Sequence, residues 1–121
     1  MKIAICSKGN TLDAEVDPRF GRCKYFLIVD TESRQFEAVD NSDNLNRAGG
    51  AGIQSAELIS SSGAEALLTG HCGPNAFMTL NAAGLKVFTG IKGSASDAID
   101  QFKRGDLKAM NAPDVERHWQ S

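Results

Sequence analysis

Three features of the sequence predict an α/β fold in three layers, with a mixed five-stranded sheet at its centre. The second half alternates short apolar runs with segments of helical period, as in strand–helix–strand units. The motif Thr69-Gly70-x-x-Gly73 recurs as Thr89-Gly90-x-x-Gly93, each time between an apolar run and a helical segment. The first half carries two β-branched or aromatic runs joined by a short turn, as in a hairpin. At 121 residues, the chain is long enough for one domain with its own core.

The first half of the chain predicts three strands and one long loop. A short apolar run makes residues 2–6 the first strand, and residues 7–22 form a polar loop. This loop is longer than most connections in a compact domain, so we expect it to be either disordered or functional. Residues 24–30 (KYFLIVD) are the clearest strand, and residues 35–40 alternate as its hairpin partner.

The second half predicts three helices and two strands, in the order helix–strand–helix–strand–helix. A glycine-rich loop, 41–52, precedes a helix marked by Ile53, Ala56, Leu58 and Ile59 that ends near residues 61–63. Residues 66–69 and 86–89 are too short for helices and are framed by glycines, as buried strands are. The remaining two helices have clear starts: Pro74 suits a first turn, and Ser94 with Asp97 fits a capping box. Gly84 and Gly105 are placed to end them. We therefore expect a domain over residues 1–107, followed by a tail at 108–121 that is partly disordered.

Composition excludes several classes of function. The 13 basic and 15 acidic residues give a net charge of −2, which argues against general binding to nucleic acid or to a membrane surface. No apolar stretch approaches the roughly 20 residues that span a bilayer. The start of the chain turns polar by Ser7 and does not resemble a signal peptide. The three cysteines are an odd number and none forms a C-x-x-C pair, so we expect reduced thiols in the cytoplasm.

The predicted strand order has a geometric consequence. If the first, fourth and fifth strands are parallel and the third runs with them, the loops 7–23, 41–52, 70–73 and 90–93 all emerge at one edge of the sheet. Open α/β sheets bind their ligands at this edge. The sequence therefore predicts the functional site there.

Two of these loops carry residues suited to an anion or a soft metal. His71 and Cys72 are adjacent, immediately before a predicted helix, where the free amides and the dipole favour a thiolate. The residue six after Cys72 is Met78 and not arginine, which excludes the phosphate loop of a cysteine phosphatase. In the other loop, Cys23 lies beside Arg19, Arg22 and Lys24, whose charges would attract an anion. For both cysteines, a purely structural role remains an alternative, and Cys6, at the end of an apolar strand, is expected in the core.

The sequence resembles the dinitrogenase iron–molybdenum cofactor biosynthesis family over about residues 2 to 107. This family includes the nitrogenase accessory proteins NifX and NafY, the C-terminal domain of NifB, and small stand-alone members in anaerobes such as the orange protein. The similarity lies in motifs that occur in the family's order and spacing. They are Asp17-Pro18-Arg19-Phe20-Gly21-Arg22-Cys23, Phe26, Asp30, Asn41, Gly50-Ala51-Gly52, Gly70-x-x-Gly73-Pro74-Asn75-Ala76-Phe77, Ala83-Gly84 and Gly90.

The resemblance implies a ribonuclease-H-like fold that carries an anionic metal–sulfide cluster without covalent attachment. Nuclease activity is not implied, because that chemistry needs a carboxylate on the first strand and residues 2–6 have none. The cluster implied contains molybdenum or iron, or molybdenum with copper as in the orange protein. The cofactor-binding residues expected are Arg19, Phe20, Gly21, Arg22, Cys23, Gly50, Gly52, His71, Cys72, Gly73 and Asn75, with Cys72 and His71 as metal ligands.

Two functions from different classes remain open at this point. The first is a non-enzymatic carrier, store or insertion partner for the cluster, which would meet a cluster donor or acceptor protein but neither nucleic acid nor a membrane. The second is a thiol-dependent transferase or oxidoreductase that uses Cys72 activated by His71. The sequence favours the carrier, because it shows no nucleotide-binding fingerprint and no third group to orient His71.

Overall fold

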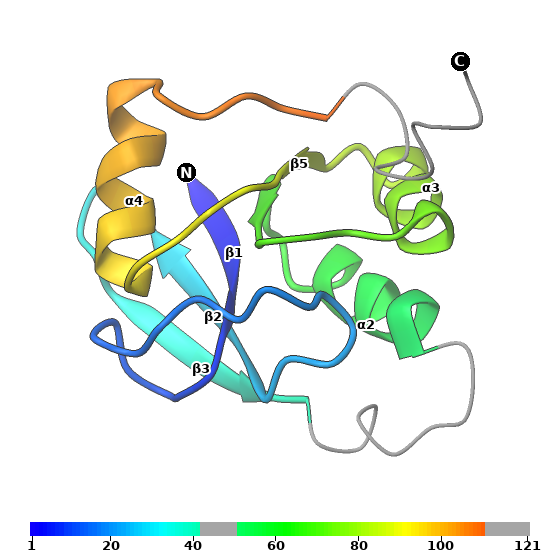
Figure 1. Cartoon of the computed structure of the whole chain (residues 1–121), viewed down its shortest axis with the longest axis horizontal. Helices are drawn as coiled ribbons and strands as arrows, with labels where there is room; N and C mark the ends of the chain where they lie inside the picture. Colours follow the sequence, from blue (N-terminus) through cyan, green and yellow to red (C-terminus); the bar gives the residue numbers. More distant parts are fainter. Residues whose placement is uncertain (42–50, 111–121) are drawn as a thin grey trace.

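The computed structural model describes residues 1–41 and 51–110, and the chain builds five strands and three helices in those ranges (Figure 1). The strands are β1 (Lys2–Ser7), β2 (Tyr25–Asp30), β3 (Phe36–Asp40), β4 (Ala66–Leu68) and β5 (Lys86–Phe88). The helices are α2 (Ala51–Ser60), α3 (Pro74–Ala82) and α4 (Ala95–Arg104). Every predicted element is present in the predicted order, with bounds that differ by one or two residues.

The strands form one mixed sheet in the order β3-β2-β1-β4-β5. β2 pairs antiparallel with both β1 and β3, and β4 pairs parallel with β1 and β5. The predicted hairpin and the two parallel crossover units are therefore confirmed. The name ribonuclease-H-like remains a prediction.

Helices cover both faces of the sheet, which makes the three predicted layers (Figure 1). Side chains alternate between the faces along each strand: Ala4, Cys6 and Leu67 join the core under α2 and α3, and their neighbours Ile3 and Ile5 join the core under α4. The central strand β1 is fully buried from Ile3 to Ser7 because both of its faces are covered.

One predicted helix face, that of α2, differs from the structure at a single position. Ile53 of α2 is 37 % exposed, while Ser55 is fully buried on the inner side and donates a hydrogen bond to Asn41 Oδ1 at 3.3 Å. A hydroxyl can occupy a core position when it has such a partner. The capping box of α4 is confirmed: Ser94 Oγ accepts from Asp97 N, and Asp97 Oδ2 accepts from Ser94 N.

The long loop between β1 and β2 is described in full, and backbone hydrogen bonds tie it to other segments: Asp17 N donates to Cys6 O and Val16 N donates to Gly93 O, both at 2.9 Å. Most of the predicted tail, 108–121, lies outside the described residues. Its first part pairs with the sheet, because Ala109 bridges Phe88 and Met110 N donates to Val87 O at 2.7 Å.

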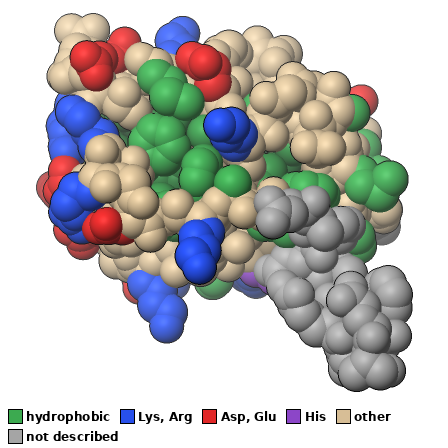
Figure 2. Space-filling model, turned by 90° about the horizontal axis from the view of Figure 1, so that it is seen from above, with side chains coloured by type: hydrophobic (Ala, Val, Ile, Leu, Met, Phe, Trp, Pro, Cys, Tyr) green, Lys and Arg blue, Asp and Glu red, His purple; other side chains and the backbone are tan. Residues whose placement is uncertain are grey.

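None of the helices described here is long and apolar enough to cross a membrane. Figure 2 shows one face of the molecule, on which Lys and Arg side chains are scattered among acidic and hydrophobic ones. The described part of this face shows no continuous basic stripe of the kind that binds nucleic acid.

Candidate functional site

The pairing of the strands places the predicted loops at one edge of the sheet. β1, β3, β4 and β5 all end at this edge, since β2 alone runs in the opposite direction. The two echoed loops lie side by side: Gly90 N donates to Gly70 O at 3.0 Å, and Ile91 N donates to Thr69 O at 3.3 Å. Of the loop 41–52, residues 42–50 lie outside the described residues.

The start of α4 is closed to a ligand. Its capping box fills the first turn with the hydroxyl of Ser94 and the carboxylate of Asp97. The loop after β1 then covers it, because Ala95 N and Ser96 N donate to Ala14 O and Leu12 O, both at 2.9 Å. An anion therefore finds neither open amides nor a favourable charge there.

The start of α3 has no such capping side chain. Its N-cap is Gly73, which supplies no side-chain hydrogen bond, and its first residue is Pro74. In such a helix, the amides of Asn75 and Ala76 have no partner within the helix, and the dipole adds a partial positive charge. No acidic residue lies in the first turn of α3. This helix start can therefore receive an anionic group.

The loop before β2 presents Arg19 and Arg22 on a tight turn, and we call residues 17–24 the arginine loop. Arg22 N donates to Arg19 O at 3.1 Å, and Gly21 has φ +92°, as the third position of a type II turn requires. Asp17, only 4 % exposed, accepts Arg19 N at 2.9 Å and lies 3.6 Å from Arg19 Nε. Asp17 thus fixes the start of the turn and offsets part of the Arg19 charge. Arg22 and Lys24, the other two basic residues near this turn, are both exposed.

This turn and the start of α3 are in direct contact. Arg19 and His71 form a parallel bridge, with Phe20 N donating to His71 O at 3.2 Å. Gly70 is so close to the first loop that a Cβ atom on it would lie 2.6 Å from Pro18 Cα. The structure therefore brings the two predicted ligand-bearing loops together, one providing cations and the other a helix N-terminus.

All three cysteines gather beneath these loops. Cys6, Cys23 and Cys72 come from β1, the arginine loop and the loop before α3, and each is fully buried in the same core cluster. Burial raises the pKa of the Cys6 thiol well above its usual value, helped by a hydrogen bond to Cys23. Cys72 Sγ lies 3.7 Å from Gly73 O. Among the described residues, no three His, Cys, Asp or Glu side chains are arranged to hold a metal ion.

The other predicted site residues lie in different surroundings. His71 is exposed, and Asn75 is exposed in the first turn of α3. Phe20 is a core residue, 9 % exposed, with its ring centroid 5.5 Å from that of Phe26. Gly52 lies in the first turn of α2, and Gly50 lies outside the described residues.

Two residues that matter for this geometry were not among the predicted site residues. Asp17 is one, and Asn41 is the other: Asn41 is 1 % exposed and donates from Nδ2 to Cys23 O and from its backbone amide to Lys24 O, both at 2.9 Å. Asn41 thereby ties the arginine loop to the end of β3 and, through Ser55, to α2. Both residues belong to the motifs that carry the resemblance to the family, but their sequence positions alone gave no role to either.

Comparison with known proteins finds similarity over nearly the full length of this chain. The profile of the family described as Dinitrogenase iron-molybdenum cofactor matches residues 1–105. An uncharacterised protein of Methanocaldococcus jannaschii is 33 % identical over 110 residues, which cover 89 % of this chain and 90 % of that protein.

Two solved structures are similar in both sequence and fold. The apo form of the orange protein from Desulfovibrio gigas has 39 % identity and a TM-score of 0.91, covering 94 % of this chain and 96 % of that one. A putative NifB protein from Thermotoga has 39 % identity and a TM-score of 0.81, covering 95 % and 97 %. The chain belongs to the dinitrogenase iron–molybdenum cofactor family.

Proposed function

We propose that this protein binds and carries an anionic metal–sulfide cluster, as a carrier, store or insertion partner, and does not catalyse a reaction. The observation that carries this proposal is the direct contact between the Arg19–Arg22 turn and the open N-terminus of α3. Membership of the family named for the iron–molybdenum cofactor supports a role in the binding or biosynthesis of such a cofactor.

Charge and amide donors would hold the cargo. Arg22 and Lys24 supply the cationic side chains, and Asn75 and Ala76 supply backbone amides at the positive end of α3. His71, which is exposed, is the imidazole that a ligand at this edge can reach without rearrangement. Cys72 is buried, so its thiolate would ligate a metal only if the loop 70–73 opened. Gly21, Gly50, Gly52 and Gly73 would allow close approach of the backbone.

The burial of Cys72 also weighs against the thiol-dependent enzyme. A nucleophilic cysteine needs a low pKa, partial exposure and a base within hydrogen-bond reach. Cys72 has no exposed surface, and its sulfur lies 3.7 Å from the carbonyl oxygen of Gly73. Binding therefore fits this geometry better than thiol catalysis.

The cluster we propose contains molybdenum, with iron or copper as the second metal. The family name points to iron and molybdenum. We propose further that the protein receives or delivers this cluster by meeting a donor or acceptor protein in the cytoplasm, since its free thiols suit a reducing compartment.

Titration of the apo protein with tetrathiomolybdate, followed by its visible absorption, tests the electrostatic part. Arg22→Ala should weaken binding by about fivefold, the upper end of the effect of one exposed charge. Raising the salt concentration should weaken it further, because an exposed contact is screened over a Debye length of about 8 Å at physiological ionic strength.

The matched control is Lys103→Ala, which removes an exposed positive charge from the last turn of α4. This variant should bind as the unmodified chain does. Binding that is indifferent both to salt and to Arg22→Ala would refute the assignment, and so would equal losses from Arg22→Ala and Lys103→Ala.

A further inference from the structure

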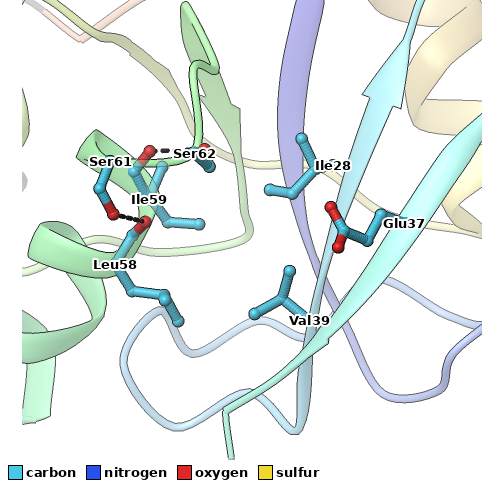
Figure 3. Close-up of a pocket in the computed structure, with 7 residues that line it drawn as sticks. All are labelled: Ile28, Glu37, Val39, Leu58, Ile59, Ser61 and Ser62. Carbon is cyan, nitrogen blue, oxygen red and sulfur yellow. Dashed lines mark hydrogen bonds between the residues drawn. The ribbon is translucent and has the colours of Figure 1, made fainter.

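A pocket that shares no residue with the arginine loop or the loop 70–73 lies between β2, β3 and the end of α2 (Figure 3). Its volume is about 180 Å³. Figure 3 shows Ile28, Glu37 and Val39 of β2 and β3 facing Leu58 and Ile59 of α2 across it, with Ser61 and Ser62 at the rim. The pocket forms because β3 extends the sheet beyond the face that α2 covers.

The size of the pocket decides what class of ligand it takes. Sites for whole small molecules usually enclose about 300–1,000 Å³. A pocket of about 180 Å³ has room for a single side chain. The occupant is therefore one anchoring residue of a larger partner.

The polar groups at the pocket act as hydrogen-bond acceptors. Ser61 and Ser62 already donate their hydroxyl protons to Leu58 O at 2.9 Å and Ile59 O at 2.6 Å, which leaves only lone pairs to a ligand. Glu37 contributes an exposed carboxylate. The apolar floor thus suits an aliphatic side chain, and its surroundings suit a neighbouring basic group.

The strand that borders the pocket is the edge of the sheet. β3 pairs with β2 on one side, and no strand in the described ranges pairs with its other side. Phe36, Glu37 and Ala38 are exposed, and Phe36 is 41 % exposed despite its large apolar ring. An exposed edge strand beside a side-chain pocket is the arrangement to which extended peptides add as a further strand.

We propose that β3 is a docking edge for a partner protein, which adds an extended segment carrying an aliphatic residue and, two positions away, a lysine or arginine. Alternate residues of an added strand face the same side of the sheet, so the aliphatic residue enters the pocket beside Val39 while the basic one faces Glu37. This docking would be a separate function from the proposed binding of the cluster.

A second copy of this chain fits the edge poorly. Antiparallel pairing of two β3 strands about Ala38 would set Glu37 opposite Val39 and Phe36 opposite Asp40. β3 contains no basic residue to face Glu37. The occupant that we propose is therefore a segment of a different protein and not a second β3 strand.

The test uses two labelled peptides of eight residues, each built from threonine, valine, isoleucine and lysine. One has Ile-Thr-Lys at its centre and matches antiparallel addition to β3. The other has Lys-Thr-Ile at its centre and matches parallel addition. Fluorescence anisotropy with the full chain should show saturable binding of at least one of them below 1 mM, about the weakest affinity such a contact is expected to have. The matching peptide with glutamate in place of lysine should bind about fivefold more weakly, as expected for a cross-strand charge pair.

Charge reversal on the protein provides the sharper comparison. Glu37→Lys should lose affinity for the lysine peptide and gain it for the glutamate peptide. Glu32→Lys, an equal change at an exposed position in the turn between β2 and β3, should change neither. An N-methylated peptide, which lacks the amide donors at alternate positions, should not bind at all.

The results of these experiments distinguish an added strand from the other possible occupants of the pocket. Equal binding of the N-methylated peptide would overturn strand addition and favour a helix or an isolated side chain in the groove. The absence of binding by both lysine peptides up to 1 mM, or binding that Glu37→Lys leaves unchanged, would overturn the proposal. A concentration-dependent dimer of the full chain that Glu37→Lys alters would also overturn it, in favour of a second copy.

Discussion

At the scale of single residues, Cys72 and His71 follow one another in the chain but meet different environments. The side chain of His71 is exposed, while that of Cys72 is fully buried beside Cys6 and Cys23. The sequence placed both within reach of the cluster and favoured Cys72 as the direct ligand. That assignment remains a prediction. Because the side chain of Cys72 is buried, it could ligate a metal only if the loop 70–73 opened locally.

Side-by-side reconstitution of three variants tests this assignment. Cys72→Ser, His71→Ala and Cys23→Ser are loaded with the same cluster, and the visible spectrum and metal stoichiometry of each are compared with those of the unmodified protein. If Cys72 is a ligand, Cys72→Ser should shift the bands, because sulfur-to-metal charge transfer depends on which sulfurs are bound. Cys6→Ser is the control, because Cys6 is another buried cysteine of the same hydrophobic core. An unchanged spectrum and stoichiometry in Cys72→Ser would show that charge, amides and packing hold the cluster.

At the scale of elements, the site depends on how closely two loops approach one another. Gly70 permits that approach, since a Cβ atom there would lie 2.6 Å from Pro18 Cα, whereas a Cβ atom on Gly73 would meet nothing within 4 Å. The pair therefore offers a matched test in one loop. Gly70→Ala should lower the free energy of unfolding by about 1–3 kcal/mol, the usual cost of overpacking.

Urea unfolding of both variants measures this difference. Gly73→Ala meets no steric conflict and should lose only the preference of an N-cap for glycine over alanine, less than about 1 kcal/mol. Gly70→Ala should also weaken tetrathiomolybdate binding, because separating the loops moves the Arg19–Arg22 turn away from the start of α3. Equal stability of the two variants would contradict the close approach.

The two echoed loops show how helix ends decide function at this scale. Both follow a parallel strand and carry the same Thr-Gly-x-x-Gly spacing, and their backbones lie side by side. The α4 start is filled by its own Ser94 and Asp97 and covered by the loop after β1, while the α3 start has no side-chain cap. The difference arises from one position, where a capping serine follows Gly93 but a proline follows Gly73.

At the scale of the whole molecule, the boundary of the domain is open to a direct test. The sequence predicted a domain over residues 1–107, yet Met110 donates its amide to Val87 O at 2.7 Å and its side chain packs against the core under α2 and α3. A chain ending at Met110 should therefore be more stable than one ending at Leu107 by about 1–2 kcal/mol, from one hydrogen bond and the buried part of the methionine.

Urea unfolding of these two truncated chains gives the answer, since they differ only in residues 108–110. A chain ending at Met110 in which Met110 is replaced by alanine separates the side chain from the backbone contact. Identical unfolding midpoints for the chains ending at 107 and 110 would place the boundary at Leu107, as the sequence predicted.

The sequence by itself determined the architecture. Its apolar periods, glycines and caps are local signals, and each of them indicates an element without knowledge of the rest of the chain. The order of those elements then fixed which loops share an edge, because a crossover between parallel strands is right-handed and returns the chain to the same edge. The convergence of Arg19, His71 and their loops therefore followed from local pattern and chirality alone.

The tertiary structure alone decided which of those loop residues a ligand can reach. Whether Cys72 is buried, whether Asp17 offsets the charge of Arg19 and whether Asn41 supports Cys23 depend on contacts between segments distant in sequence. No period or motif encodes such contacts, because they arise only when separate loops pack against one another. The pocket between β3 and α2 has the same origin: it is the space that two correctly predicted elements leave between them.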